Sequence, residues 1–84
     1  MNVDKKTAQN QNTKIVIPKN IGINIAVAMQ IANITQTELA QKLGITQAEI
    51  SLWKNSRRLP NILELKKMSE IFKKPMEWFF KEIE

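Results

Sequence analysis

The sequence predicts an all-α fold, because its apolar residues recur at helical spacing and helix start and stop signals separate the periodic segments. The clearest pattern lies between Thr35 and Pro60, where two short amphipathic helices are joined by a tight turn and followed by basic residues. A chain of 84 residues allows one domain. We place a flexible arm at residues 1–19 and the helical domain at residues 20–84.

The arm is predicted from its composition. Residues 1–14 are polar and have no hydrophobic period, which is typical of a flexible segment. Residues 15–17 are β-prone, and Pro18 ends this short run. The run could pair with its counterpart in a dimer, or it could cover the core of its own domain.

A first helix is predicted over residues 21–33, with Asn20 as its N-cap. The inward stripe of this helix comprises Ile21, Ile25, Ala28, Met29 and Ala32. A second stripe, on the other side, comprises Ile23, Val27 and Ile31. A single surface helix needs only one apolar side, so we expect a partner subunit or residues 15–17 to cover the second stripe. The alternation of apolar residues over 21–29 also fits a strand, which stays open as an alternative.

The next two helices form a predicted helix-turn-helix. Thr35 opens the first of them with a capping box, and Gly44 supplies the positive φ that ends it. Thr46 and Glu49 repeat the capping box, so a second helix over residues 47–55 begins within three residues of the first helix's end. Such a unit presents its second helix to the major groove of DNA.

The second helix of this unit turns Ile50 and Trp53 inward and an almost uncharged face outward. Glutamine can bond adenine through two hydrogen bonds, serine can bond several bases, and alanine or leucine can meet a thymine methyl group. The candidate DNA-binding residues on this helix and its cap are Thr46, Gln47, Ala48, Ser51 and Leu52. Taken alone, this face also fits an ordinary solvated helix in a small bundle.

A basic run follows the second helix. Lys54, Arg57 and Arg58 lie between Glu49 and Glu64 with no intervening acid. Side chains at this place, at the edge of the groove that the helix enters, contact phosphates. In the preceding helix, the amide of Gln36 and the helix N-terminus are expected to hold another phosphate.

Asn61 is predicted to cap a fourth helix over residues 62–72, and Pro75 opens a fifth. Four large apolar residues crowd the fifth helix and cannot all point inward, so Trp78 or Phe80 is expected to form a dimer contact. The predicted core comprises Ile25, Met29, Ala32, Leu39, Leu43, Ile45, Ile50, Trp53, Leu65, Met68, Phe72, Met76 and Phe79.

These elements resemble the phage Cro and repressor family of helix-turn-helix domains, also called XRE-like. The resemblance covers residues 20–80 and rests on the segments TQTELAQKLG, ITQAEISLW, NSRRLPN and LKKMSEIFKKPMEWFF. It implies a five-helix repressor-like DNA-binding domain with the helix-turn-helix at helices 2 and 3. It further implies that Gln36 touches phosphate and that Gln47, Ala48, Ser51 and Leu52 face bases. By the same resemblance, the DNA backbone is contacted by Asn55, Arg57 and Arg58.

Two positions depart from the family pattern. Members often pair an arginine in the first helix with a glutamate near the end of the recognition helix, and these positions hold Met29 and Lys54 here. Lys54 is therefore expected to be free to contact phosphate. Ser56 stands where the family commonly has glycine, which concerns the turn after the recognition helix.

Composition restricts the remaining possibilities. The formal charge of +5 and the pI near 9.8 favour a polyanionic partner, although charge alone would suit an acidic membrane surface equally. Histidine, cysteine and tyrosine are absent, so we predict a non-enzyme with no metal, cofactor or small-molecule substrate. The sequence has neither an apolar run of membrane-spanning length nor a signal-peptide pattern, so a cytoplasmic protein is expected.

The sequence thus favours a sequence-specific DNA-binding transcription regulator, expected to be a repressor, that reads a pseudo-palindromic double-stranded operator as a homodimer. The alternative is a protein-interaction module of the same fold, such as an antitoxin or antirepressor. The neutral helix face beside a basic run favours DNA. Candidate residues for the dimer interface are Trp78, Phe80, Ile23, Val27 and Ile31.

Overall fold

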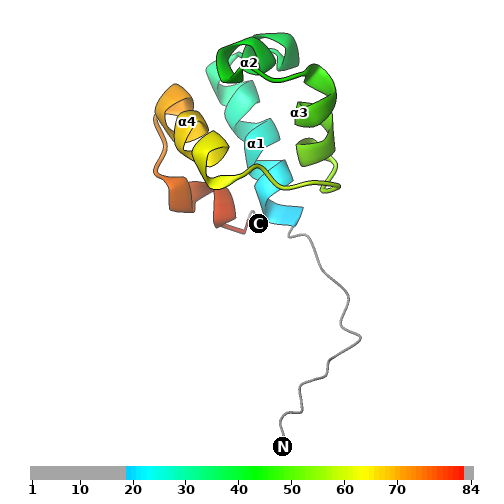
Figure 1. The fold of residues 1–84 in the computed structure, drawn as a ribbon. Helices are drawn as coiled ribbons and strands as arrows, with labels where there is room; N and C mark the ends of the chain where they lie inside the picture. The colour runs from blue at the N-terminus through cyan, green and yellow to red at the C-terminus, as the bar shows by residue number, and fades with distance from the viewer. Residues whose placement is uncertain (1–18, 83–84) are drawn as a thin grey trace, which may run out of the picture.

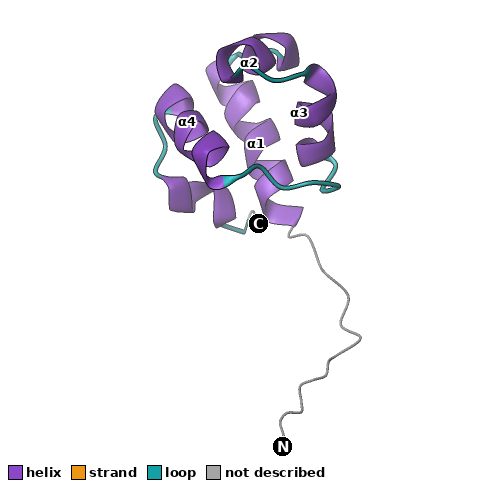
Figure 2. Cartoon of the chain, in the orientation of Figure 1, coloured by secondary structure: helices purple, strands orange, loops and turns teal. Residues whose placement is uncertain are grey.

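The computed structural model describes residues 19–82, which form four α-helices and one 3-10 helix (Figures 1 and 2). The elements are α1 (Lys19–Ala32), α2 (Gln36–Leu43), α3 (Gln47–Lys54), α4 (Ile62–Phe72) and the 3-10 helix η2 (Met76–Phe80). No strand occurs between residues 19 and 82, so the predicted all-α fold is confirmed there. The predicted count of five helices is not confirmed, because the segment expected to form the fifth forms only the short 3-10 helix η2. The arm before Lys19, with its β-prone run at residues 15–17, lies outside the described residues.

The helix α1 runs behind the other elements in Figure 1 and contacts α3, α4 and η2. The strand alternative for residues 21–29 is wrong, because a helix gathers the inward residues of this segment on one buried side. Two smaller predictions are also wrong. Ala32 is exposed because it is the last residue of the helix, and Asn20 lies inside α1, where its side chain donates to the carbonyl of Phe80.

The core lies between α1 and the elements around it, with α2 packed on α3 and α4. Its buried apolar residues are Ile21, Ile25, Ala28, Met29, Leu39, Ala40, Leu43, Ile50, Trp53, Leu65, Met68, Phe72 and Phe79. Ile45 and Met76, predicted as core, are half-buried at its edge. Within residues 19–82, no helix has the length and the apolar character needed to cross a membrane.

The ends of α2 form as predicted. The hydroxyl of Thr35 accepts from the backbone N–H of Glu38 at 3.1 Å, and the Glu38 carboxylate accepts from the backbone N–H of Thr35 at 2.8 Å. The latter bond, which favours the ionised carboxylate, holds the pKa of Glu38 below its ordinary value. Gly44 follows at φ 71°, a left-handed conformation that glycine adopts without steric cost.

Side-chain hydrogen bonds hold the start of α4 and the end of η2 in place. Asn61 and Glu64 form a capping box at the start of α4. At the other end, the Asn24 side chain of α1 is buried and donates to the carbonyls of Phe79 and Lys81, each at 2.8 Å. These bonds tie η2 to the middle of the chain's first helix. They stabilise the carboxyl-terminal segment even though η2 is too short to be stable alone.

Candidate nucleic-acid interface

The outward face of α3 carries no charged side chain between Gln47 and Leu52, because the Glu49 side chain points toward Trp53 and Arg58. Ile50 and Trp53 are fully buried against the core and fix the rotation of the helix, as predicted. On the opposite side Gln47 and Ala48 are exposed, and Ser51 and Leu52 are half-buried. The structure therefore brings the four predicted base-facing side chains onto one surface. Polar and small side chains of this kind suit the base edges of a major groove.

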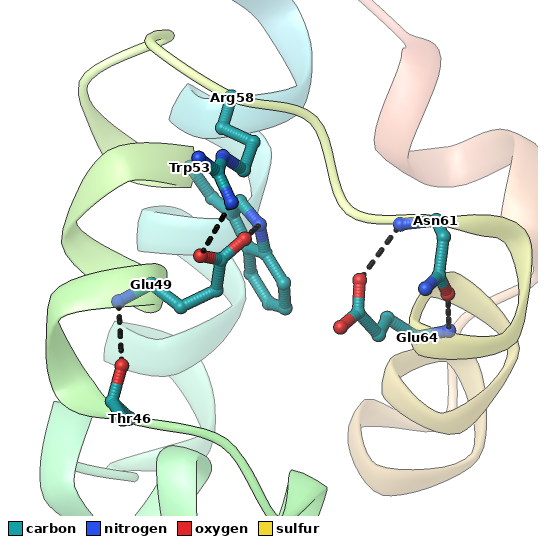
Figure 3. A network of polar contacts seen from close by, with 6 residues as sticks. All are labelled: Thr46, Glu49, Trp53, Arg58, Asn61 and Glu64. Atoms are coloured by element: carbon teal, nitrogen blue, oxygen red, sulfur yellow. Dashed lines mark hydrogen bonds and ion pairs between the residues drawn. The ribbon is translucent and has the colours of Figure 1, made fainter.

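The Glu49 carboxylate, which we predicted to complete a capping box, binds elsewhere (Figure 3). The Thr46 hydroxyl accepts from the Glu49 backbone N–H at 3.2 Å, so half of the predicted box is present. The carboxylate itself accepts from the indole N–H of Trp53 at 3.0 Å and pairs with Arg58 at 3.3 Å. The buried indole otherwise has an unsatisfied donor, which explains why the carboxylate turns toward it.

Arg58 therefore has an internal partner. Its side chain remains largely exposed, so the pair with Glu49 is solvent-screened and weak. Beside this pair lies a shallow hollow of about 470 Å³ between the N-termini of α3 and α4, lined in part by Glu49 and Glu64. Two carboxylates in its wall make it unsuited to a phosphate.

Gln36 is the first residue of α2, and its side chain links α2 to α3. Its side-chain N–H donates to the carbonyl of Gln47 at 3.0 Å, and its side-chain oxygen accepts from the ammonium of Lys54 at 3.2 Å. Lys54 thus has a partner other than phosphate, contrary to our expectation that it is free. Met29, at the other position that departs from the family pattern, is buried in the core.

The turn after α3 is built without glycine. The side chain of Asn55 donates to the Ser51 carbonyl at 2.9 Å. Ser56 then adopts φ 60°, and the backbone N–H of Arg57 donates to the Leu52 carbonyl at 2.9 Å. Arg57 is exposed at the tip of this turn. Within residues 19–82, its guanidinium has no ion-pair partner.

Among residues 19–82, three apolar surfaces are exposed, and the sequence had indicated two of them. On α1, Ile23 and Ile31 are exposed and Val27 is half-buried, and at the carboxyl-terminal end Phe80 is half exposed. Trp78 is half-buried, with its ring edge-on to Phe79 at 5.2 Å and beneath the Lys74 ammonium. The surface that we missed surrounds the start of α4 and comprises Leu59, Ile62 and Leu63. The sequence feature that could have indicated this surface is the segment 59–63, in which three of five residues are apolar beside Pro60 and the cap Asn61.

A model of the helix-turn-helix family matches residues 25–79. No curated protein matches the sequence. The fold is similar to that of the P22 c2 repressor in complex with a synthetic operator, with a TM-score of 0.66 at 24% identity. That match covers 70% of this chain and 89% of the repressor chain.

The DNA-binding domain of the P22 c2 repressor in solution gives a TM-score of 0.68 at 24% identity, covering 73% of this chain and 80% of that domain. The restriction-modification controller protein C.AhdI from Aeromonas hydrophila gives 0.67 at 13% identity, covering 74% of this chain and 94% of the controller. At these identities the solved structures establish the shared fold.

Proposed function

The chain belongs to the helix-turn-helix family, and we propose that it regulates transcription by inserting α3 into the major groove of operator DNA. The observation that carries this proposal is the uncharged outer face of α3, flanked by polar and basic side chains. Gln47, Ala48, Ser51 and Leu52 are the proposed base-facing residues, with Thr46 at their edge. The alternative of a protein-interaction module is not favoured, because a neutral face beside a basic turn suits DNA better than protein.

Phosphate contacts are proposed on both sides of that face. Arg57 at the tip of the turn is exposed and is the strongest candidate, with Asn55 and Arg58 beside it. At the other side Gln36 lies at the N-terminus of α2, where backbone N–H groups favour an anion. These contacts would position α3 without reading sequence.

We further propose that the protein binds as a homodimer and acts as a repressor. The eight residues of α3 span only part of one major groove, so one domain reads few bases. Two copies related by a twofold axis would read half-sites about 34–36 Å apart. The P22 c2 repressor, which has a similar fold and whose structure is of a complex with a synthetic operator, supports this mode of action.

The phosphate contacts are tested by a salt titration of DNA affinity for the parent and for Arg57→Ala. The logarithm of affinity should fall linearly with the logarithm of salt, with a slope of about −0.9 per phosphate neutralised. Arg57→Ala should reduce the magnitude of that slope by about one unit per domain and should weaken binding to all DNA sequences to the same extent. Lys67→Ala, which removes an exposed lysine of α4, is the matched control for net charge. Equal slopes for all three proteins would remove Arg57 from the interface.

The dimer is tested by analytical ultracentrifugation of variants in each exposed apolar surface. Val27→Glu, Phe80→Ala and Leu63→Glu alter the three surfaces one at a time. Only the variant in the true interface should dissociate the dimer, because a carboxylate or a cavity there removes buried apolar area. A parent that stays monomeric on operator DNA would contradict the dimer proposal.

A further inference from the structure

Three polar groups link the two ends of α3 to the start of α2. The Lys54 ammonium donates to the Gln36 side-chain oxygen at 3.2 Å, and the Gln36 side-chain nitrogen donates to the Gln47 carbonyl at 3.0 Å. Gln47 begins α3 and Lys54 ends it, so both ends of this helix bond the same amide. Lys54 and Gln36 are half-buried, unlike Arg57, which is exposed at the tip of the turn.

This chain of bonds fixes which way the Gln36 amide points. A flipped amide would place its N–H groups against the Lys54 ammonium and its oxygen against the Gln47 carbonyl, so both bonds would be replaced by repulsion. In the observed orientation one side-chain N–H is used for Gln47, and the second hydrogen on that nitrogen remains for another acceptor. A phosphate oxygen is such an acceptor, whereas the amide oxygen of a flipped Gln36 would repel it.

We propose that Lys54 is a positioning residue, which acts on DNA through Gln36 instead of contacting a phosphate itself. The bond from Lys54 holds the Gln36 amide, and Gln36 in turn holds the first turn of α3, where the proposed base-reading residue Gln47 lies. The family's usual ion pair between the first helix and the recognition helix is absent here, and this chain links α3 to α2 instead. The inference rests on the proposed function.

A direct phosphate contact and a positioning role predict different binding data. Lys54→Met should weaken binding to the preferred site by about tenfold, because a charged hydrogen bond is lost and α3 shifts. Binding to a scrambled duplex should stay within about twofold of that of Lys67→Met, which removes the same charge from α4, and the salt slopes of the two variants should agree. Lys54→Arg, which keeps a donor, should restore most of the preference. In a Gln36→Ala background, Lys54→Met should cause no further loss.

The inference would be overturned if Lys54→Met weakened binding to both duplexes equally and reduced the salt slope of affinity by about one unit. Lys54 would then be a phosphate contact. Additive losses in the double variant would overturn it as well. The free protein offers a second test: the NMR resonances of the Gln36 side-chain amide should move in Lys54→Met and stay in place in Lys67→Met. Unmoved resonances would overturn the inference even if DNA binding holds. A parent that binds neither duplex would instead remove the proposed function.

Discussion

Gly22 of α1 lies directly against the backbone carbonyl of Trp53 at the end of α3. A Cβ built on Gly22 would overlap this oxygen and would lie 2.9 Å from the carbonyl oxygen of Lys54. Only glycine lets the two helices approach this closely. The contact sets the position of α3 on the core, and therefore the position of the proposed DNA-reading face.

Gly22→Ala should destabilise the protein by about 1–3 kcal/mol, the usual cost of forcing extra atoms into a packed contact. The higher helix propensity of alanine, about 1 kcal/mol, does not offset a clash with backbone atoms. Urea denaturation followed by the fluorescence of the two tryptophans, Trp53 and Trp78, measures this change in the free energy of unfolding. Gln30→Ala, an exposed position in the same helix, is the control and should be neutral or stabilising. A stable Gly22→Ala protein would contradict the close contact.

Ser56→Gly should stabilise the protein by about 1 kcal/mol. Ser56 sits at φ 60°, a left-handed conformation that costs residues other than glycine roughly 1–2 kcal/mol. The greater entropy of glycine in the unfolded chain returns part of that gain. Thermal unfolding of the parent, Ser56→Gly and Ser56→Ala measures the effect. Since alanine relieves no strain, a gain for Ser56→Ala equal to that for glycine would refute this explanation.

Asn24→Leu should release η2 from α1. The substitution removes the donor to the Phe79 and Lys81 carbonyls, and a buried acceptor left without a partner costs about 1–3 kcal/mol. Backbone hydrogen exchange over residues 76–82 should accelerate more than exchange in α2. Asn20→Ala, which removes an exposed 3.3 Å bond to Phe80, should have little effect. Unchanged exchange in Asn24→Leu would show that packing alone holds η2.

The α2 capping box should make stability depend on pH through Glu38. The pKa of Glu38 is below its ordinary value of 4.5 because its carboxylate accepts from the Thr35 backbone N–H. A lowered pKa in the folded state gives a stabilisation that is present above pH 4.5 and is lost as the pH falls through the folded value. Denaturation of the parent and Glu38→Gln across acid pH should therefore show a stability difference that disappears at low pH. A pH-independent difference would contradict the prediction.

The local signals of the helix-turn-helix could be predicted from the sequence because each depends on neighbouring residues. Thr35, Gly44 and Asn61 act within one helical turn, so their caps form where the sequence places them. Ile50 and Trp53 are buried as the 3.6-residue period requires. Glu49 is the exception, because the indole N–H of Trp53, one helical turn later, and the guanidinium of Arg58 compete with the Thr46 backbone N–H for the same carboxylate.

The features that sequence reasoning missed depend on contacts between elements. Gly22 has no local signal, since its role comes from the approach of α3. Asn24 looks like a polar interruption of an apolar helix until the carbonyls of η2 are placed beside it. The partner of Lys54 could not be found for the same reason, because Gln36 lies 18 residues earlier and meets it only through the turn between α2 and α3.

The most direct test of the central claim is selection of bound sequences from a random DNA pool by the parent and by Gln47→Ala. Because Gln47 is exposed at the start of α3, we expect the parent to select a pseudo-palindromic site. Gln47→Ala should lose preference at one or two base pairs in each half-site, at a cost of about 1–3 kcal/mol on the parent's site. A parent that enriches no sequence, or a variant whose selected sequence matches the parent's at every position, would contradict base reading by α3.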